Sequence, residues 1–367
     1  MGILQPIWDG TFVYREPVCF SADKDGRPTG GTLLYQPEEI LSVTSFDGSV
    51  FYQPVRDYTA NGRQLVRTEA SRIPYLERSV YCKPFTGVPE TAWVRLSGGK
   101  AYMEVVSDVY RWQTLVTYTH RDKWAGFQPE ACGESLPRSM EKLRAGGDFH
   151  LTLYGDSITA GWEASGCNER AIDMVTLGEY HVSLWHAPYQ PAWAELVTNA
   201  LQARYPQSNV IKTNRAAGGS TVQWGVEHAA ELVPPCKPDL IMLGFGMNSM
   251  QESAEDYRRA ILSIIRTIRK ECHDCEFVLV SPMIPNPEIK GFQNNQLPAQ
   301  QDVLYQIAAE LEGVCIAPVH SVFREMTARG KHYLELTGNC INHPNDFSVR
   351  VYAQTVLRTL GVDGSDG

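Results

Sequence analysis

Short apolar runs alternate with amphipathic helical stretches throughout the second half of the chain. Five runs have the length and composition of buried strands: 149–154, 209–213, 239–243, 276–280 and 314–317. Helical periodicity appears over 191–205, 253–268, 298–311 and 346–360, with Gly361 as a stop signal after the last stretch. Strands that alternate with helices pair in parallel, and helices cover both faces of their sheet. The pattern therefore predicts an α/β fold, a flavodoxin-like three-layer α/β/α domain around a five-stranded parallel sheet.

The first part of the chain has strand signals and no helical period. Segments rich in β-branched and aromatic residues recur at 39–44, 49–52, 92–96, 101–106 and 114–118. Glycine-containing turns such as Asp47-Gly48 and Asn61-Gly62 separate the segments. We therefore expect an all-β, jelly-roll-like sandwich domain over residues 1–135, a linker over 136–147, and the α/β domain over 148–367.

Composition excludes several classes of partner. The formal net charge of −9 and the absence of a basic cluster argue against nucleic acid. No apolar run approaches the roughly 18 residues of a membrane helix, and the N-terminus lacks a signal pattern, so we expect a cytoplasmic protein without a membrane partner. The nine cysteines are dispersed, and the Cys272–Cys275 pair has no second pair with which to form a metal site. We expect neither a metal nor another cofactor. The sequence carries no indication of the oligomeric state.

Residues with chemical function follow four of the predicted elements. In parallel sheets, ligands bind beyond the carboxyl ends of the strands. Ser157 follows the first strand, a loop with Gly219 follows the second, and Asn248 follows the third. His343 lies in a loop after the fifth strand and an intervening helical stretch. A hydroxyl, a glycine loop, an amide and an imidazole are together what acyl transfer requires.

These loops resemble the four sequence blocks of the SGNH (GDSL-type) hydrolases. The blocks are Gly155-Asp156-Ser157-Ile158, Asn214 to Gly219, Gly246-Met247-Asn248 and Asn342-His343-Pro344-Asn345, and they occur in the family's order over about 148–362. The resemblance implies Ser157 as nucleophile and His343 as general base. It also implies an oxyanion hole formed by the amides of Ser157 and Gly219 and the side chain of Asn248.

The chain departs from the family pattern at the third triad position. The aspartate that usually stands three residues before the histidine is replaced by Cys340. A histidine base needs an acceptor at its other ring nitrogen. A backbone carbonyl of residues 339–342 is the favoured acceptor, which would make a Ser157–His343 dyad. The carboxylate of Asp346 is the alternative, although we expect Asp346 to cap the last helix.

Three further residues are candidates for substrate binding. The long connection 163–190 follows the nucleophile and is expected to roof the pocket, with Trp185 and His186 as contacts. Trp224 either stacks on a sugar or packs in the core.

The order of a β-sandwich and an SGNH domain resembles that of carbohydrate esterases. It implies a small-molecule or oligosaccharide ester as substrate, with removal of acetyl groups from plant-type oligosaccharides as the leading hypothesis. A general short-chain esterase or lipase-like hydrolase is one alternative. A glycan-binding protein with a weakened catalytic centre is another.

Overall fold

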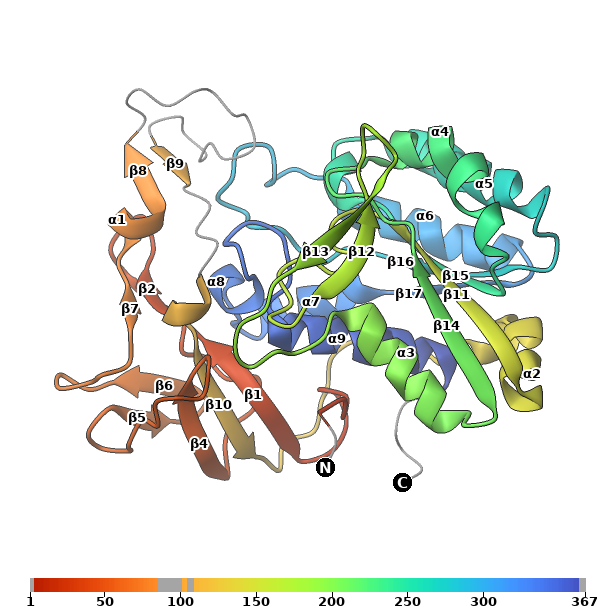
Figure 1. The fold of residues 1–367 in the computed structure, drawn as a ribbon. Coiled ribbons are helices and arrows are strands. Elements are labelled where there is room, and N and C mark those ends of the chain that lie inside the picture. The colour runs from red at the N-terminus through yellow and green to blue at the C-terminus, as the bar shows by residue number, and fades with distance from the viewer. Residues whose placement is uncertain (1–2, 85–100, 104–108, 363–367) are drawn as a thin grey trace.

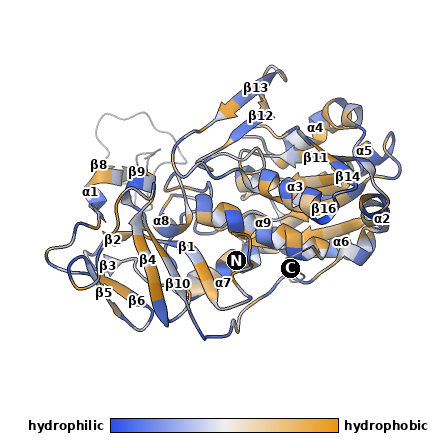
Figure 2. Cartoon of the chain, turned by 60° about the horizontal axis from the view of Figure 1, so that its bottom comes forward, coloured by the Kyte–Doolittle hydropathy of each residue, from blue (hydrophilic) through white to orange (hydrophobic). Residues whose placement is uncertain are grey.

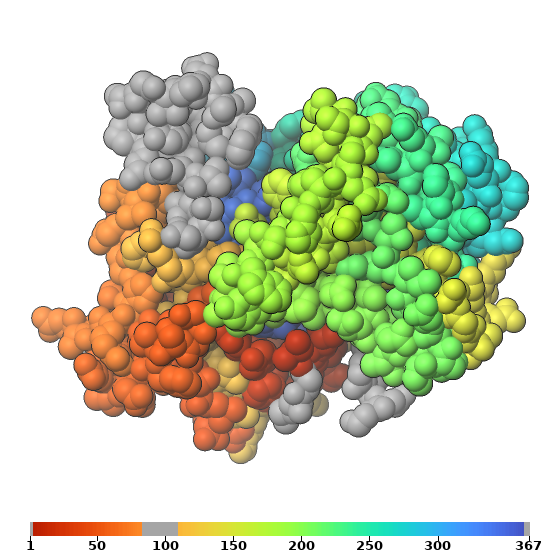
Figure 3. Space-filling model, viewed as in Figure 1, coloured from red at the N-terminus to blue at the C-terminus, as the bar shows by residue number. Residues whose placement is uncertain are grey.

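The computed structural model describes residues 3–84, 101–103 and 109–362. A β-rich half formed by the early strands lies beside a larger half in which helices surround a central sheet (Figure 1). In the space-filling view the two halves touch along a broad junction (Figure 3). None of the described helices has the length and apolar character needed to span a bilayer.

The central sheet has five parallel strands in the order β14-β11-β15-β16-β17. Their bounds are β11 Gly147–Gly155, β14 Ser208–Asn214, β15 Leu240–Gly244, β16 Glu276–Val280 and β17 Val314–Ala317. This confirms the predicted α/β fold and its five strands. The first strand lies between the second and the third, so the chain changes direction across the sheet at β11. Ligands of such folds bind at this switch point.

Alternating side chains of the strands face two helical layers. Leu240 and Met242 of β15 join one buried cluster, and Ile241 and Leu243 join the other. The first layer contains α2 Pro137–Ala145, α3 Trp193–Arg204, α7 Val319–Ala328 and α9 Asp346–Leu360. The second contains α4 Val222–Leu232, α5 Ala254–Arg269 and α6 Leu297–Glu310. Strands β15, β16 and β17 are buried along their whole length, whereas β14, at the edge of the sheet, is mostly polar. The helices that cover the sheet combine hydrophobic with hydrophilic residues (Figure 2).

Helix termini follow the expected signals where the sequence carries them. Ser253 caps α5 by accepting a hydrogen bond from the Asp256 N–H. Gly361 ends α9 in the left-handed conformation, with φ of 69°. The sequence analysis did not identify α4 or α7.

The β-rich character of the first half is also confirmed. Its principal sheet is antiparallel and comprises β1 Phe12–Val18, β10 Thr114–Thr119 and β4 Glu39–Ser45, in that order. The smaller sheets use β2 Phe20–Ala22, β3 Pro28–Thr29, β5 Tyr58–Asn61, β6 Gln64–Arg67, β7 Tyr75–Leu76, β8 Cys82–Pro84 and β9 Ala101–Met103.

Three of the expected strands of this half are not seen in full. Segment 49–52 is not a strand; it contributes a single bridge between Phe51 and Thr44. Segment 92–96 and the end of 101–106 lie outside the described residues.

The expected linker 136–147 is instead part of the α/β half. It contains α2 and the first residue of β11. Pro137 stands in the first turn, where a missing N–H costs nothing, and Met140 and Leu143 are buried in the first helical layer. Pro137 and Gly146, which suggested a linker, are therefore the start and end signals of a short amphipathic helix.

A buried ion cluster joins the two halves. The Lys331 Nζ lies 3.0 Å from Glu16 of β1 and 3.3 Å from Glu335, and all three side chains are buried. Glu335 belongs to the short helix α8 Tyr333–Leu336 and also accepts N–H bonds from Cys19 and Gly31. Buried charges require such partners. Helix α8 leads directly into the loop that carries His343.

Candidate active site

The loops after three sheet strands and the loop before α9 meet at one cavity of about 750 Å³. Ser157 reaches it from the end of β11, Gly219 from the end of β14, and Asn248 from the end of β15. His343 reaches it from the loop between α8 and α9. The structure thus brings together the four residues that the sequence analysis selected.

The turn that presents Ser157 is held by Asp156. The Asp156 N–H donates to the Gly244 carbonyl at 3.2 Å, and its Oδ1 accepts the Ile158 N–H at 3.0 Å. Burial raises the pKa of the Asp156 carboxyl to about 6. The turn is buried, with Asp156, Ser157 and Ile158 each at most 5% exposed, and of these three Ser157 lines the cavity.

The Ser157 hydroxyl and the His343 imidazole are in hydrogen-bond contact. The distance from Ser157 Oγ to His343 Nε2 is 2.8 Å. A compact loop holds the imidazole: the Gly338 N–H donates to the His343 carbonyl, and the Asn339 Oδ1 accepts the N–H groups of Ile341, Asn342 and His343. This is the geometry that a base needs in order to take the proton of a nucleophile.

Donors for an oxyanion lie beside the serine. Gly219 has φ of +79°, a conformation that glycine adopts without strain, and a Cβ there would meet no atom within 4 Å. Within the described part of the chain, neither the Ser157 N–H nor the Gly219 N–H donates a hydrogen bond. The Asn248 Nδ2 donates to the Ser220 carbonyl at 3.0 Å, which leaves its second hydrogen available.

The acceptor that faces the other nitrogen of His343 is Glu163. The Glu163 Oε1 lies 3.7 Å from His343 Nδ1, and the two side chains are 15% and 12% exposed. Within the described residues, Nδ1 has no hydrogen-bond partner, so it is not bonded to a carbonyl of residues 339–342. Sequence reasoning missed Glu163, because no family block contains it.

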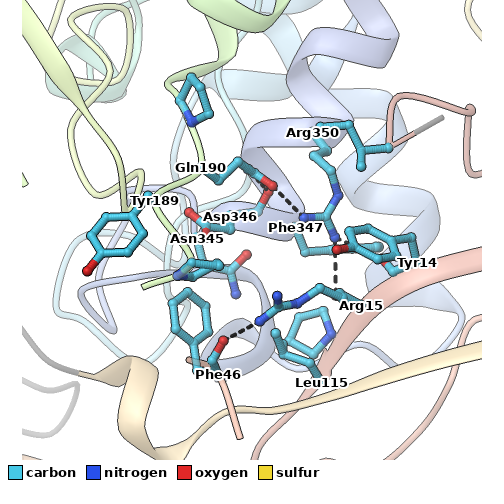
Figure 4. A pocket seen from close by; sticks show the side chains of 14 residues that line it. Tyr14, Arg15, Phe46, Leu115, Tyr189, Gln190, Asn345, Asp346, Phe347 and Arg350 are labelled. Atoms are coloured by element: carbon cyan, nitrogen blue, oxygen red, sulfur yellow. Dashed lines mark hydrogen bonds between the residues drawn. The ribbon is translucent and has the colours of Figure 1, made fainter. Parts of the chain in front are cut away.

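The structure does not bring Asp346 to the histidine. Its carboxylate accepts the Ser165 N–H at 2.9 Å and the Ser165 hydroxyl at 2.7 Å. Asp346 is the first residue of α9, whereas the cap is Asn345, which accepts the Ser348 N–H. Asp346 lines a separate cavity of about 210 Å³ at the junction of the two halves, beside Arg350 (Figure 4).

Cys340 does not replace the missing aspartate in this arrangement. Its thiol is buried in an apolar cluster that includes Cys19 and Ile289. Its carbonyl accepts a hydrogen bond from the Asn286 side chain at 2.8 Å.

The backbone at Glu163 is strained. Its φ is +70°, which is unusual for a residue with a side chain. Glu163 also packs against the histidine loop, since a Cβ added at Gly338 would lie 2.9 Å from the Glu163 Cβ. Strained residues gather at functional sites, where the surrounding packing maintains them. The strain and the packing together aim this carboxylate at His343.

Trp162 forms the wall between the oxyanion loop and the histidine. Its ring lies edge-on to His343, with centroids 5.6 Å apart. A Cβ added at Gly218 would lie 2.7 Å from the indole, so the tryptophan packs directly on that glycine. The sequence analysis did not select Trp162.

The three candidate substrate contacts lie away from the cavity. Trp224 is buried in α4, donates its indole N–H to the Met174 carbonyl, and packs near Tyr154. Trp185 is exposed and pairs with Tyr189, whereas His186 packs against Tyr110. None of the three is among the described residues that line the cavity.

The connection 163–190 forms a hairpin of β12 Asn168–Ile172 and β13 Glu179–Ser183, rather than a roof built by its whole length. Among the described residues of this connection, Glu163 alone lines the cavity. No group of residues able to hold a metal ion occurs in the described ranges.

Comparison with known proteins gives one family match. The model of the GDSL-like lipase/acylhydrolase family matches residues 153–348, which is more than half of the chain. No curated protein matches the sequence.

Solved structures resemble this one at low identity. A two-domain esterase active on acetylated mannans, co-crystallised with mannopentaose, is 20% identical with a TM-score of 0.48; the match covers 65% of this chain and 57% of that one. An acetylxylan esterase from Geobacillus stearothermophilus is 20% identical with a TM-score of 0.46, over 59% of this chain and 96% of that one. A hydrolase from the metagenome of Lake Arreo, Spain, is 19% identical with a TM-score of 0.45, over 61% of this chain and 100% of that one.

Proposed function

Since this chain belongs to the GDSL-like lipase/acylhydrolase family and is a carboxylic ester hydrolase, we propose that it cleaves short-chain esters, above all acetyl esters, through an acyl-enzyme on Ser157. The observation that carries this proposal is the 2.8 Å contact between Ser157 Oγ and His343 Nε2. The contact lies in a cavity that also holds the unused N–H of Gly219 and the amide of Asn248. A nucleophile, a base and oxyanion donors are therefore present together.

Each step of the reaction uses one of these groups. Ser157 Oγ attacks the ester carbonyl carbon, and its proton passes to His343 Nε2. The resulting oxyanion accepts hydrogen bonds from the Ser157 and Gly219 N–H groups and from Asn248. His343 then gives the proton to the departing alcohol, which leaves the acyl group on Ser157. In the second half of the reaction His343 takes a proton from water, the resulting hydroxide attacks the acyl-enzyme, and the acid is released as the proton returns to Ser157 Oγ. Glu163 stabilises the imidazolium that forms between these transfers.

Trp162 supports a short acyl group. Its indole packs on Gly218 and stands edge-on to His343, and it therefore occupies space beside the carbonyl that Ser157 attacks. A bulky ring at this position leaves room for a methyl group more readily than for an alkyl chain.

We expect hydrolysis of p-nitrophenyl esters to slow from acetate through butyrate to octanoate. The fall in kcat/KM should reach at least about tenfold, because the Trp162 ring leaves no room for the additional methylene groups of a longer acyl chain. In Trp162→Ala the difference between acetate and butyrate should shrink or reverse. Trp185→Ala is the matched control, since Trp185 is 66% exposed and does not line the cavity, and its profile should equal that of the wild type. Rates that rise with chain length in the wild type would instead support the lipase-like alternative.

The alcohol part of the substrate is proposed to be an oligosaccharide. A cavity of about 750 Å³ is within the range of ligand pockets and far exceeds the volume an acetyl group needs. Its wall combines Phe292 with the polar side chains Gln251, Lys290 and Asn342. An aromatic ring beside several hydrogen-bonding groups suits a sugar, which has apolar ring faces and hydroxyl edges.

Release of acetate from acetylated xylo- and manno-oligosaccharides tests this part of the proposal. We expect at least one of these substrates to exceed ethyl acetate in kcat/KM by about 10²-fold or more, because contacts to the sugar contribute binding energy that ethanol cannot. Lys290→Ala should raise KM for that oligosaccharide and leave ethyl acetate unaffected. If no oligosaccharide is better than ethyl acetate, the substrate is a simple ester and the sugar proposal is wrong.

A further inference from the structure

His343 is attached to the fold differently from the other groups of the site. Ser157, Gly219 and Asn248 follow strands of the central sheet. His343 lies in the loop 337–345, which we call the histidine loop, between α8 and α9 and beyond the last sheet strand. Its position therefore depends on whatever holds the two ends of this loop.

One side chain of the β-rich half joins both ends of the histidine loop. Gln113 precedes β10 and is 1% exposed. Its Nε2 donates to the carbonyl of Leu334 in α8 at 2.8 Å and to that of Thr337, where the loop begins, at 2.9 Å. Its Oε1 accepts from the Asn345 Nδ2 at 3.0 Å, where the loop ends. Both amide hydrogens and the amide oxygen of Gln113 are thus used on this loop and on the helix α8 that leads into it.

Between its two ends the histidine loop is stiff. Thr337 and Pro344 form an antiparallel bridge, and Asn339 accepts three backbone N–H groups. Asn286, after β16, bonds the backbone of Cys340 at 2.8 Å and of Ile341 at 2.7 Å. A loop held this tightly transmits a displacement of its ends to the imidazole.

A second residue of the β-rich half packs on the loop from the same side. A Cβ added at Gly338 would lie 2.5 Å from the Tyr110 hydroxyl oxygen. The Gln113 N–H donates to the Tyr110 carbonyl at 3.0 Å, so the two residues form one short turn against the loop. The β-rich half therefore supports the base of the site, although none of its described residues lines the catalytic cavity.

We propose that Gln113 is a positioning residue, which sets the distance and angle between His343 and Ser157 from the other half of the protein. The proposal rests on the function proposed above for His343. It assigns the β-rich half a part in catalysis that is separate from substrate binding.

Gln113→Met removes the three hydrogen bonds while keeping the length of the side chain. We expect kcat for ethyl acetate to fall about 10²-fold, because misplacement of a reacting group by about 1 Å has an effect of this size. KM should change less than about threefold. Hydrolysis of p-nitrophenyl acetate should also fall, because His343 takes the Ser157 proton with either ester. Its loss should be the smaller one, since nitrophenolate leaves without the proton that His343 must supply to ethanol.

Gln354→Met is the matched control. Gln354 of α9 is 3% exposed, and its amide also makes hydrogen bonds to a distant segment, at Gln5 and Ile7, but it makes none to the histidine loop. We expect Gln354→Met to lower Tm about as much as Gln113→Met does. Its kcat should equal that of the wild type. Should Gln113→Met fail to fold, Gln113→Glu retains the size and the acceptor for Asn345 and gives the same two-ester comparison.

The outcomes separate this inference from the proposed function. Wild-type kcat in a folded Gln113 variant, or a loss that falls on KM rather than on kcat, would overturn the positioning role. If His343→Ala remains fully active, the proposed function itself fails, whatever the Gln113 variants do.

Discussion

Ser157→Ala is expected to lower kcat for p-nitrophenyl acetate by about 10⁶-fold while the protein remains folded. The substitution removes the oxygen that forms the acyl-enzyme, and no other hydroxyl among the described residues lies in hydrogen-bond contact with His343. What activity remains would come from the oxyanion donors, which act on water attack as well. Single-turnover assays of the wild type and of Ser157→Ala, at equal enzyme concentration, measure the difference in rate.

Ser281→Ala controls for the loss of a buried hydroxyl. Ser281 is 1% exposed and its hydroxyl bonds Gln301 at 2.9 Å, away from the cavity. This variant should lose stability, by about 1 kcal/mol, but keep its turnover. Substantial esterase activity in Ser157→Ala would show that the acyl-enzyme proposal is wrong, whereas an inactive wild type would favour the glycan-binding alternative.

Glu163→Gln is expected to lower kcat by about 10²–10³-fold, with little change in KM. The carboxylate lies 3.7 Å from His343 Nδ1, and the imidazolium that forms during turnover is stabilised by a negative charge at this distance. Glutamine keeps the size of the side chain and its contact with Gly338 but removes the charge. The measurement is kcat and KM for ethyl acetate, together with a thermal melt to confirm folding.

Asp346→Asn is the matched control for Glu163→Gln. Asparagine can accept the Ser165 N–H and donate to the Ser165 hydroxyl, so both contacts of the carboxylate are replaced. Burial raises the pKa of the Asp346 carboxyl, so its ionised form destabilises the folded state increasingly as pH rises above the usual aspartate range. Asp346→Asn should therefore gain stability relative to the wild type as pH rises above the usual aspartate range, and keep kcat within about threefold. A large loss of turnover in Asp346→Asn but not in Glu163→Gln would reverse the assignment.

Much of the α/β half could be predicted because its elements carry strong local signals. The runs 276–280 and 314–317 became strands with those bounds, and the last helix begins at Asp346 and ends before Gly361 as expected. Periodicity was a poorer guide over 136–147, where the short length, one proline and two glycines concealed α2. In the β-rich half the strands are short, and pairing between distant segments determines where they end.

The residues of the site divide in the same way. Ser157, Gly219 and Asn248 could be placed together from sequence alone, because the carboxyl ends of parallel strands lie at one edge of a sheet. Trp185, His186 and Trp224 could not be placed, since an aromatic side chain in a loop or on a helix packs equally well in a core or beside a substrate. The structure puts Trp224 in the core and the other two outside the cavity.

The order of the sheet strands along the chain, and with it the meeting of Ser157, Gly219 and Asn248 at one rim, was determined by the sequence itself. These features follow from local periodicity and from the geometry of parallel sheets. Only the tertiary structure decided that Glu163 faces His343 and that Gln113 holds the histidine loop. Both contacts join segments far apart in the chain, and Glu163 owes its aim to a strained backbone. No sequence pattern reports such contacts, because packing between loops and halves creates them.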